Sequence, residues 1–373
     1  SPEAFEIERR LKEEIDIPVM HDDQHGTAII SAAALINAIE LANKKIKDVK
    51  IVVSGAGAAA ISCSKLYLSL GANIKNLIML DSKGVIKKNR KNLTPEKEQF
   101  ATNLDIKNLE EAIVNADVFI GLSQPNILSP SMLKRMASNP IVFAMANPDP
   151  EIGYDIACKT RKDIIMATGR SDHPNQVNNV LGFPFIFRGA LDVRATAINE
   201  EMKMAAVKAL ADLAKEPVPE QVNVAYEETR LTFGKNYIIP KPFDPRLITT
   251  IPPAVAKAAM DSGVATEPIE DWERYINSLE KRLGNSQKMV RLLHDRAKLS
   301  PKRLVFAEAD QMDVLKAAQI VHEEGIAIPI LLGNISRIKE LRRIIEFDDD
   351  IEVIDPKEEK EKELRKKYAE LFW

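Results

Sequence analysis

The chain has 373 residues, enough for two domains or for one large domain with an appendage. Its hydrophobic content of 45% and charged content of 29% are typical of a globular protein with a large core. A formal net charge of -3 gives no reason to expect nucleic-acid binding, and no apolar run reaches the roughly 18 residues of a membrane span. The two cysteines, Cys63 and Cys158, form neither a disulfide framework nor a CxxC motif. We therefore expect a cytoplasmic protein. Because the first residue is serine, we also expect the beginning of the chain to be trimmed or missing.

The first elements predicted along the chain are helical. Residues 3–14 have the pattern of an amphipathic helix. Residues 21–27 read as a polar loop, and Thr27 is placed to cap an apolar helix over residues 28–43. Because that helix is apolar on nearly every side, we expect it to be buried.

A strand–helix rhythm follows. Short apolar runs at strand length occupy residues 49–54, 77–80, 118–122, 141–146 and 164–167, and the first of them leads into a helix over residues 57–70. Continuous apolar strands that alternate with helices are typical of a parallel sheet covered on both faces. The predicted fold class is α/β, a Rossmann-like doubly wound sheet in which ligands bind beyond the carboxyl ends of the strands.

The C-terminal part predicts a second α/β domain. A long helix over residues 198–214 and a proline-rich stretch over 240–253 complete the first domain, which we place at residues 1–265. Residues 266–300 are predicted to be a linker and a charged helix. Residues 301–373 then begin a new domain that does not close, with strands over 303–307, 328–332 and 351–354 and a charged helix over 357–372.

A glycine-rich turn carries the signature of dinucleotide binding. The first strand runs into Gly55-Ala-Gly57-Ala-Ala-Ala60 and then into a helix. In this pattern Gly55 permits the tight turn, Gly57 lets the backbone approach a pyrophosphate, and Ala60 lets the helix pack close to the strand. Asp81 ends the next strand, where an acidic residue can bind the adenine ribose. The alternative is a plain tight turn in an α/β domain.

Asp81 does not decide between NAD and NADP. Ser82 and Lys83 follow it, and a cluster of basic residues lies nearby, comprising Lys87, Lys88, Arg90, Lys91 and Lys97. A hydroxyl and basic side chains at this place can receive a 2′-phosphate, which favours NADP. The alternative is a solvated basic loop.

Two adjacent carboxylates, Asp22 and Asp23, stand in the polar loop between His21 and His25. In an extended loop neighbouring side chains point in different directions, so one aspartate can bind a metal while the other orients a hydrogen-bond network. Hard oxygen ligands suit Mg²⁺ or Mn²⁺. No third ligand stands at the spacing of a zinc site, which makes zinc the lesser option. Spacing alone favours the alternative, an acidic loop that caps a helix.

Four motifs in this order resemble the malic enzymes. They are His21-Asp-Asp-Gln-His-Gly-Thr-Ala28, Gly55-Ala-Gly-Ala-Ala-Ala60, Phe143-Ala-Met-Ala-Asn-Pro148 and Thr168-Gly-Arg-Ser-Asp-His-Pro-Asn-Gln-Val-Asn-Asn179. The tail from Trp272 resembles the opening of the phosphotransacetylase-like domain of the long bacterial form. The resemblance implies oxidation of malate with NAD(P)⁺ and a divalent metal, followed by decarboxylation to pyruvate.

The resemblance also implies roles for individual residues. Asp23 is similar to the metal-binding aspartate of the family, and Asp22 to the aspartate that supports the catalytic network. Asn147 and Asn179 match asparagines that hold the substrate carboxylate and the nicotinamide side of the site, and Asn178 lies beside them. His21 and His25 read as supporting polar groups. Turn and helix-cap roles are the alternatives for the three asparagines.

The chain also departs from the family pattern. The tyrosine and lysine that transfer protons, the substrate-binding arginine and a Glu-Asp metal pair belong to a segment before Ser1, and no tyrosine here lies in a matching motif. We therefore expect a chain truncated at both ends, and a homo-oligomer or an enzyme that needs a separate N-terminal chain. A non-catalytic dinucleotide-binding remnant and a different amino- or hydroxy-acid dehydrogenase are the alternatives.

Overall fold

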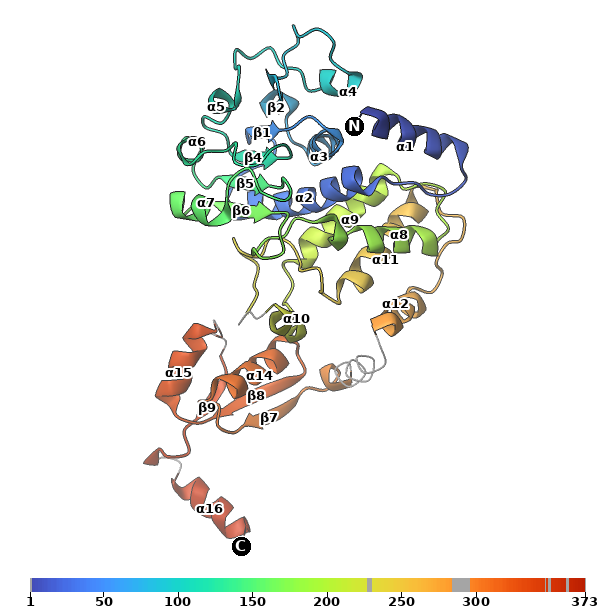
Figure 1. Cartoon of the computed structure of the whole chain (residues 1–373). Helices are drawn as coiled ribbons and strands as arrows, with labels where there is room; N and C mark the ends of the chain where they lie inside the picture. The colour runs from blue at the N-terminus through green and yellow to red at the C-terminus, as the bar shows by residue number, and fades with distance from the viewer. Residues whose placement is uncertain are drawn as a thin grey trace. The chain divides into compact units, whose positions relative to one another are not determined.

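The computed structural model describes residues 2–226, 230–283, 296–345, 347, 350–359 and 362–372. The chain divides into two compact units (Figure 1). Unit 1 comprises residues 1–216 and 232–277, and unit 2 comprises residues 217–231 and 278–373. In the part of the chain that the structure describes, no helix combines the length and apolar character needed to cross a membrane.

The sheet of unit 1 has six strands among the described residues, in the order β3-β2-β1-β4-β5-β6. They are β1 (Ile51–Ser54), β2 (Leu77–Asp81), β3 (Gly84–Val85), β4 (Val118–Gly121), β5 (Ile141–Ala144) and β6 (Ile165–Thr168). All are parallel except β3, which pairs antiparallel with β2 at the edge. In register, Val53 of β1 lies beside Met79 of β2 and Ile120 of β4. The chain crosses over between β1 and β4, which is where an open parallel sheet forms its ligand crevice.

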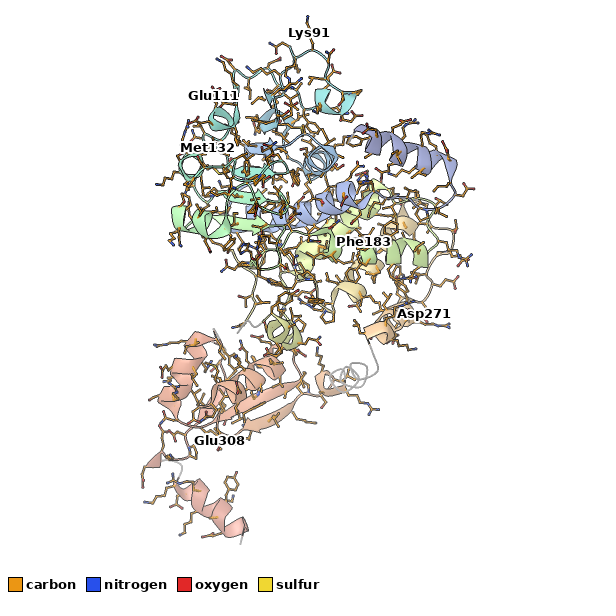
Figure 2. All side chains as sticks on the ribbon, in the orientation of Figure 1. Lys91, Glu111, Met132, Phe183, Asp271 and Glu308 are labelled. Carbon is orange, nitrogen blue, oxygen red and sulfur yellow. The ribbon has the colours of Figure 1, made fainter. Side chains whose placement is uncertain are left out.

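Helices cover both faces of this sheet (Figure 1). Alternate strand side chains, such as Val53, point to one face of the sheet and form a core with five helices. These helices are α2 (Asp22–Leu41), α3 (Ala58–Ser69), α8 (Phe183–Asp192), α9 (Glu200–Leu213) and α11 (Leu247–Asp261). The other strand side chains, such as Val52, enter a second core with α5 (Leu109–Ala112), α6 (Pro130–Lys134) and α7 (Tyr154–Thr160). Side chains fill the space between these layers (Figure 2). The predicted α/β fold with a doubly covered parallel sheet is confirmed.

The remaining elements of unit 1 are short or lie at its edges. They are α1 (Pro2–Glu14), η1 (Ile74–Asn76), α4 (Pro95–Glu98) and η2 (Asn179–Leu181), and the first six residues of α12 (Trp272–Glu280) end the unit. The proline-rich stretch partly coincides with α11, which includes Pro252 and Pro253. Of the predicted charged helix over 272–297, the structure gives α12 and η3 (Lys281–Leu283), and residues 284–295 lie outside the described residues.

One prediction near the N-terminus is wrong. Residues 21–27 are not a polar loop, because α2 begins at Asp22, and Thr27 lies within it rather than capping it. Gly26 has a low helix propensity, so the sequence pattern places the helix start after it. In the structure a Cβ on Gly26 would lie 2.1 Å from Oδ1 of Asp22 and 2.8 Å from Cβ of Asn179. A close approach of neighbouring side chains therefore requires glycine here. The two acidic residues in the first turn interact favourably with the helix dipole and so stabilise a helix that starts at Asp22.

The described residues of unit 2 form a parallel three-stranded sheet in the order β7-β8-β9, from β7 (Lys302–Phe306), β8 (Ala327–Leu332) and β9 (Glu352–Ile354). The α-helices named among its described residues include α10 (Glu220–Ala225), α14 (Met312–Glu323), α15 (Ile335–Ile344) and α16 (Lys362–Phe372). A small core forms around Leu315, Leu331 and Ile338. The three predicted strands are confirmed, with boundaries shifted by one residue or none.

Candidate functional site

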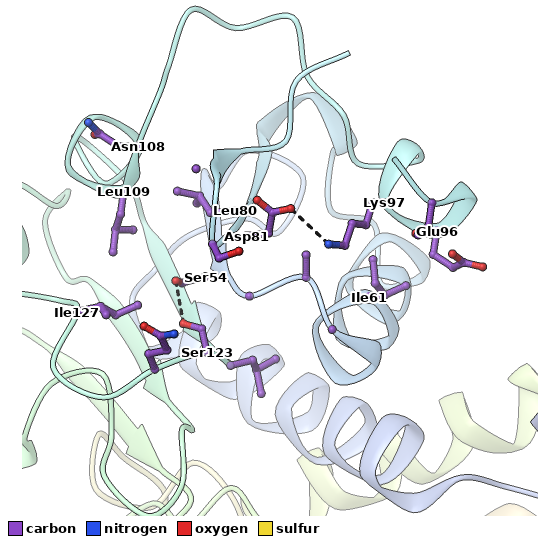
Figure 3. A pocket seen from close by; sticks show the side chains of 18 of the residues that line it. Ser54, Ile61, Leu80, Asp81, Glu96, Lys97, Asn108, Leu109, Ser123 and Ile127 are labelled. Carbon is purple, nitrogen blue, oxygen red and sulfur yellow. Dashed lines mark hydrogen bonds and ion pairs between the residues drawn. The ribbon is translucent and has the colours of Figure 1, made fainter. Parts of the chain in front are cut away.

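A cleft of about 800 Å³ opens beyond the carboxyl ends of β1, β2 and β4 (Figure 3). The last residues of these strands and the turns that follow them line it, among them Ser54, Gly55, Asp81 and Ser123. The hydroxyls of Ser54 and Ser123 lie 3.1 Å apart and link the turns after β1 and β4. The cleft therefore lies where the sheet topology predicts a ligand.

The glycine turn after β1 forms one wall of this cleft. Gly55 has a φ of +121°, and a Cβ there would lie 2.4 Å from the carbonyl oxygen of Leu122. By contrast, a Cβ on Gly57 would meet nothing within 4 Å. Gly55 is thus required by the fold, whereas Gly57 leaves open space above the N-terminus of α3, where backbone N–H groups attract phosphate. Ala60 is buried against the sheet, as the pattern predicts.

Asp81 is at the centre of a charged cluster at the end of β2. Arg90 donates to both carboxylate oxygens, at 3.0 and 2.8 Å, and Lys97 Nζ lies 3.3 Å from Oδ2 (Figure 3 draws the Lys97 contact). Burial raises the pKa of Asp81, but the hydrogen bonds from Arg90, the Lys83 backbone and Lys97, together with the charge of Arg90, outweigh it, so the pKa lies below its ordinary value.

The other predicted residues around Asp81 differ in their positions. Ser82 lines the cleft, and Lys83 contributes its backbone N–H to Asp81 at 2.9 Å. Lys91 projects away from the body of the unit (Figure 2). The basic residues that contact Asp81 with their side chains are therefore Arg90 and Lys97, both from the predicted cluster.

Asp22 and Asn179 come together although 157 positions separate them. Asn179 Nδ2 donates to Oδ2 of Asp22, from the start of η2 to the first turn of α2. Oδ1 of Asp22 is buried and has no hydrogen-bond partner among the described residues. Burial and the neighbouring charge of Asp23 raise the pKa of Asp22.

The other residues predicted to bind the metal or the substrate are Asp23, Asn178 and Asn147, and all three lie in unit 1. Asp23 is exposed. Asn178 caps η2 by accepting a hydrogen bond from the N–H of Val180 at 3.0 Å. Asn147, which follows β5, is exposed, and its Oδ1 would lie 3.3 Å from a Cβ on Gly169, after β6. The structure thus pairs Asp22 with Asn179 and sets Asn147 against the turn after β6.

The described residues supply only part of a metal site. Across the described ranges, no group of three or more histidine, cysteine, aspartate or glutamate side chains is arranged to hold a metal ion. Asp22 and Asp23 provide hard oxygens, and the orphaned Oδ1 of Asp22 suits a cation. Mg²⁺ and Mn²⁺ require about six oxygen ligands. The carboxylates of Asp22 and Asp23 therefore do not fill the coordination shell of either ion by themselves.

His25 belongs to a hydrogen-bonded network rather than to a metal site. Its Nε2 lies 2.9 Å from Oε1 of Glu8, and its Nδ1 lies 3.1 Å from Nζ of Lys203. Burial lowers the pKa of His25. The backbone N–H of His21 also donates to Glu8. Both histidines thus lie beside Glu8 of α1.

Two buried side chains that shape the loops of the site are not evident from sequence patterns. Glu151, with 0% exposure, accepts hydrogen bonds from the backbone N–H groups of Ser123 and Ala146 at 3.0 and 3.1 Å. Asn175, also 0% exposed, joins Met166 to Lys235 and Ile238 through backbone contacts. A turn of the form Asn-Pro-Asp-Pro-Glu is the only sequence signal for Glu151, and it does not reveal the burial.

Comparisons with known proteins give a consistent result. Residues 24–227 match the family model described as malic enzyme, NAD binding domain, and residues 288–373 match the model described as phosphate acetyl/butaryl transferase. Over 360 residues the chain is 51% identical to the NADP-dependent malic enzyme of Salmonella typhimurium, which covers 95% of this chain and 47% of that protein. Over 362 residues it is 50% identical to the NAD-dependent malic enzyme of Rhizobium meliloti, with the same shares of 95% and 47%.

A solved structure agrees with the sequence matches. The malic enzyme of Entamoeba histolytica superposes with a TM-score of 0.68 at 34% identity, covering 79% of this chain and 60% of that chain. The chain spans about half the length of the curated relatives it matches. Because relatives named for NADP and for NAD match it almost equally, overall identity does not separate the two cofactors.

Proposed function

Because this chain belongs to the malic enzyme family, we propose that unit 1 binds NAD(P)⁺ for the oxidation and decarboxylation of malate to pyruvate. The observation that carries the proposal is the cleft beyond β1, β2 and β4, with Gly57 leaving open space at the start of α3. A pyrophosphate there would meet backbone N–H groups and the positive end of the helix dipole. When bound, the dinucleotide supplies the hydride acceptor.

NADP is the preferred cofactor in this proposal. The carboxylate of Asp81 already accepts hydrogen bonds from Arg90 and Lys97, so it is less available to the hydroxyls of an adenine ribose. The same two cations can receive a 2′-phosphate, and Arg90 can do so with two parallel hydrogen bonds. Ser82 and Lys83 directly follow Asp81, where the sequence pattern predicts a hydroxyl and a basic side chain that help to receive a 2′-phosphate.

The catalytic part of the proposal rests on Asp22, Asp23 and the asparagines. We assign Asp23 as a ligand of Mg²⁺ or Mn²⁺, and Asp22 as the group that orients Asn179 and holds negative charge beside it. Asn147, Asn178 and Asn179 would donate their amide N–H groups to the substrate carboxylate or to the nicotinamide. A divalent cation, when bound, supplies positive charge to the oxygen that becomes negative during the reaction.

The chain as a whole is proposed to have three parts, namely residues 1–265, a linker and charged helix over 266–300, and the start of a phosphotransacetylase-like domain over 301–373. The match of residues 288–373 to the acetyl/butyryl transferase model supports the last of these. We further propose that the protein forms a homo-oligomer or associates with a separate N-terminal chain that completes the site.

A second candidate is a dinucleotide-binding subunit without turnover of its own. The incomplete ligand set around Asp22 and Asp23 favours it. Two measurements on the chain separate the candidates. The first is NADP⁺ binding by calorimetry, and the second is malate-dependent formation of NADPH in the presence of Mn²⁺.

Turnover by the chain alone would support an intact enzyme and eliminate the second candidate. Binding without turnover, with activity restored by an added N-terminal polypeptide, would support an enzyme of two chains. Absence of dinucleotide binding even at millimolar concentration would refute both. In any active form, Asp23→Ala should abolish metal-dependent turnover while leaving NADP⁺ affinity nearly unchanged, because Asp23 does not line the dinucleotide cleft.

A further inference from the structure

Helix α1 contributes a side chain to the wall of the dinucleotide cleft. Phe5, in the first turn of this helix, lines the cleft together with Gly57 and Ile61. The side chain is partly buried and packs against the core of unit 1. Helix α1 lies beside α3 and contacts it (Figure 1). An aromatic side chain therefore stands next to the N-terminus of α3, where the proposed function places a pyrophosphate.

A buried carboxylate on the same face of α1 joins this helix to α2. Glu8 follows Phe5 by three residues, so the two side chains share a face of the helix. Glu8 is 7% exposed, accepts the backbone N–H of His21 at 3.2 Å and lies 2.9 Å from Nε2 of His25. The ring of His25 in turn contacts Lys203 of α9. Glu8 therefore fixes α1 against the N-terminal end of α2.

The role of Glu8 differs from that of the other carboxylates along α1. Glu6, Glu13 and Glu14 pair with arginines of α1 itself, whereas Glu8 reaches a second helix. The outer face of α1 is open, as shown by Ile7, which is 57% exposed. The placement of α1, and with it the placement of its cleft-lining side chain, thus depends on Glu8.

We propose that α1 is a wall of the cofactor site, with Phe5 covering the bound dinucleotide at its pyrophosphate and Glu8 positioning Phe5. The aromatic ring excludes water from the phosphates, and hydrogen bonds from the N–H groups of α3 are stronger where water is excluded. This proposal rests on the proposed binding of NAD(P)⁺ by unit 1. It adds two residues that belong neither to the glycine turn nor to the cluster around Asp81.

The first test is a calorimetric titration of the full chain with NADP⁺. Phe5→Ala should weaken binding about tenfold, because it removes the apolar contact of an aromatic side chain. Phe5→Leu, which keeps most of the apolar volume, should retain most of the affinity. Ile7→Ala is the matched control on the exposed face of the same helix and should leave the affinity unchanged.

The second test asks whether Glu8 acts through Phe5. Glu8→Ala should weaken NADP⁺ binding several-fold, although the removal of a carboxylate by itself favours an anionic ligand. Glu8→Gln, whose amide oxygen can still accept from His21, should fall between this variant and the wild type. Glu13→Gln, an exposed carboxylate on the same helix, should have no effect.

The double variant Phe5→Ala/Glu8→Ala separates positioning from general damage. It should bind NADP⁺ no more weakly than Phe5→Ala alone, because the placement of α1 matters to the cofactor only while the ring is present. Independent effects would instead add. Thermal unfolding without NADP⁺ establishes that each variant is folded at the temperature of the titration, and Glu8→Gln replaces Glu8→Ala in the cycle if the alanine variant does not fold.

Wild-type affinity in a folded Phe5→Ala variant would overturn the proposal, even if that variant is less stable. Unchanged affinity in the Glu8 variants, or additive losses in the double variant, would overturn the positioning role of Glu8. Absence of NADP⁺ binding by the wild type would refute the proposed function and this proposal with it. Normal binding by the wild type and by all the variants would refute the role of α1 alone.

Discussion

Glu151 offers a sharp test of how the loops around the cleft are held. Its carboxylate accepts backbone N–H groups from Ser123, after β4, and from Ala146, after β5. In Glu151→Gln the amide oxygen can keep one of these bonds, but the NH₂ group faces the other donor. A buried donor left without a partner costs about 1–3 kcal/mol, and the lower end applies because the variant no longer buries a charge.

Glu151→Ala removes both acceptors and leaves a void beside Gly121, whose Cβ position would lie 2.2 Å from Cδ of Glu151. We expect a loss of about 3 kcal/mol or more in the free energy of unfolding, against about 1 kcal/mol for the glutamine variant. Because Ser123 lines the dinucleotide cleft, the alanine variant should also bind NADP⁺ several-fold more weakly.

The pH dependence adds a further criterion. Burial raises the pKa of Glu151 above its ordinary value of 4.5, so this group contributes stability that is present at acid pH and is lost as the pH rises. The stability gap between wild type and Glu151→Gln should therefore widen as the pH falls from neutral towards 4.5. Urea unfolding at several pH values measures the gap, with the exposed Glu201→Gln as the matched control. Equal stability of Glu151→Gln and wild type at every pH, with unchanged NADP⁺ affinity in Glu151→Ala, would refute the reasoning.

Three other predictions follow from the geometry of unit 1. Gly57→Ala should leave the urea midpoint nearly unchanged while weakening NADP⁺ binding in calorimetry, because its Cβ meets only the space for a ligand. Gly55→Ala, at positive φ and against a carbonyl, should lose roughly 1–3 kcal/mol of stability. A greater loss of stability in Gly57→Ala than in Gly55→Ala would contradict these roles. Arg90→Ala should weaken NADP⁺ binding about tenfold or more and shift cofactor preference towards NAD⁺, because it removes a cation and frees Asp81. An equal loss of affinity for both cofactors in a binding titration would argue against a 2′-phosphate contact. Burial raises the pKa of Glu8, but hydrogen bonds from His25 and Lys12 outweigh burial and lower this pKa to about 2. The stability that Glu8 contributes is therefore present above the ordinary pKa of 4.5 and is lost as the pH falls towards 2. Unfolding midpoints of Glu8→Gln should consequently vary less over that acid range than those of the wild type, and parallel curves would exclude this role.

Local patterns in the sequence were sufficient to predict the turn at Gly55 and the strands of both sheets except β3 (Gly84–Val85), which is too short to give an apolar run. Apolar runs of four to six residues between turn signals identify buried strands, and the alternation of strands with helices implies parallel pairing. The turn is predictable for the same reason, since glycine spacing and the adjoining strand and helix are all contained within a few residues. Roles for Asp22, Asp23 and the asparagines could be suggested from motif resemblance, and they remain predictions for experiment.

Contacts between distant parts of the chain were decided only by the tertiary structure. The start of α2 is an example. The low helix propensity of Gly26 predicts a helix that begins after this residue, whereas in the structure Gly26 lies within α2, where Asn179 approaches Asp22. The network of Glu8, His25 and Lys203, like the burial of Glu151, has no local signal for a similar reason. Each depends on which backbone and side-chain groups the fold brings within hydrogen-bond distance, and spacing along the sequence does not encode that distance.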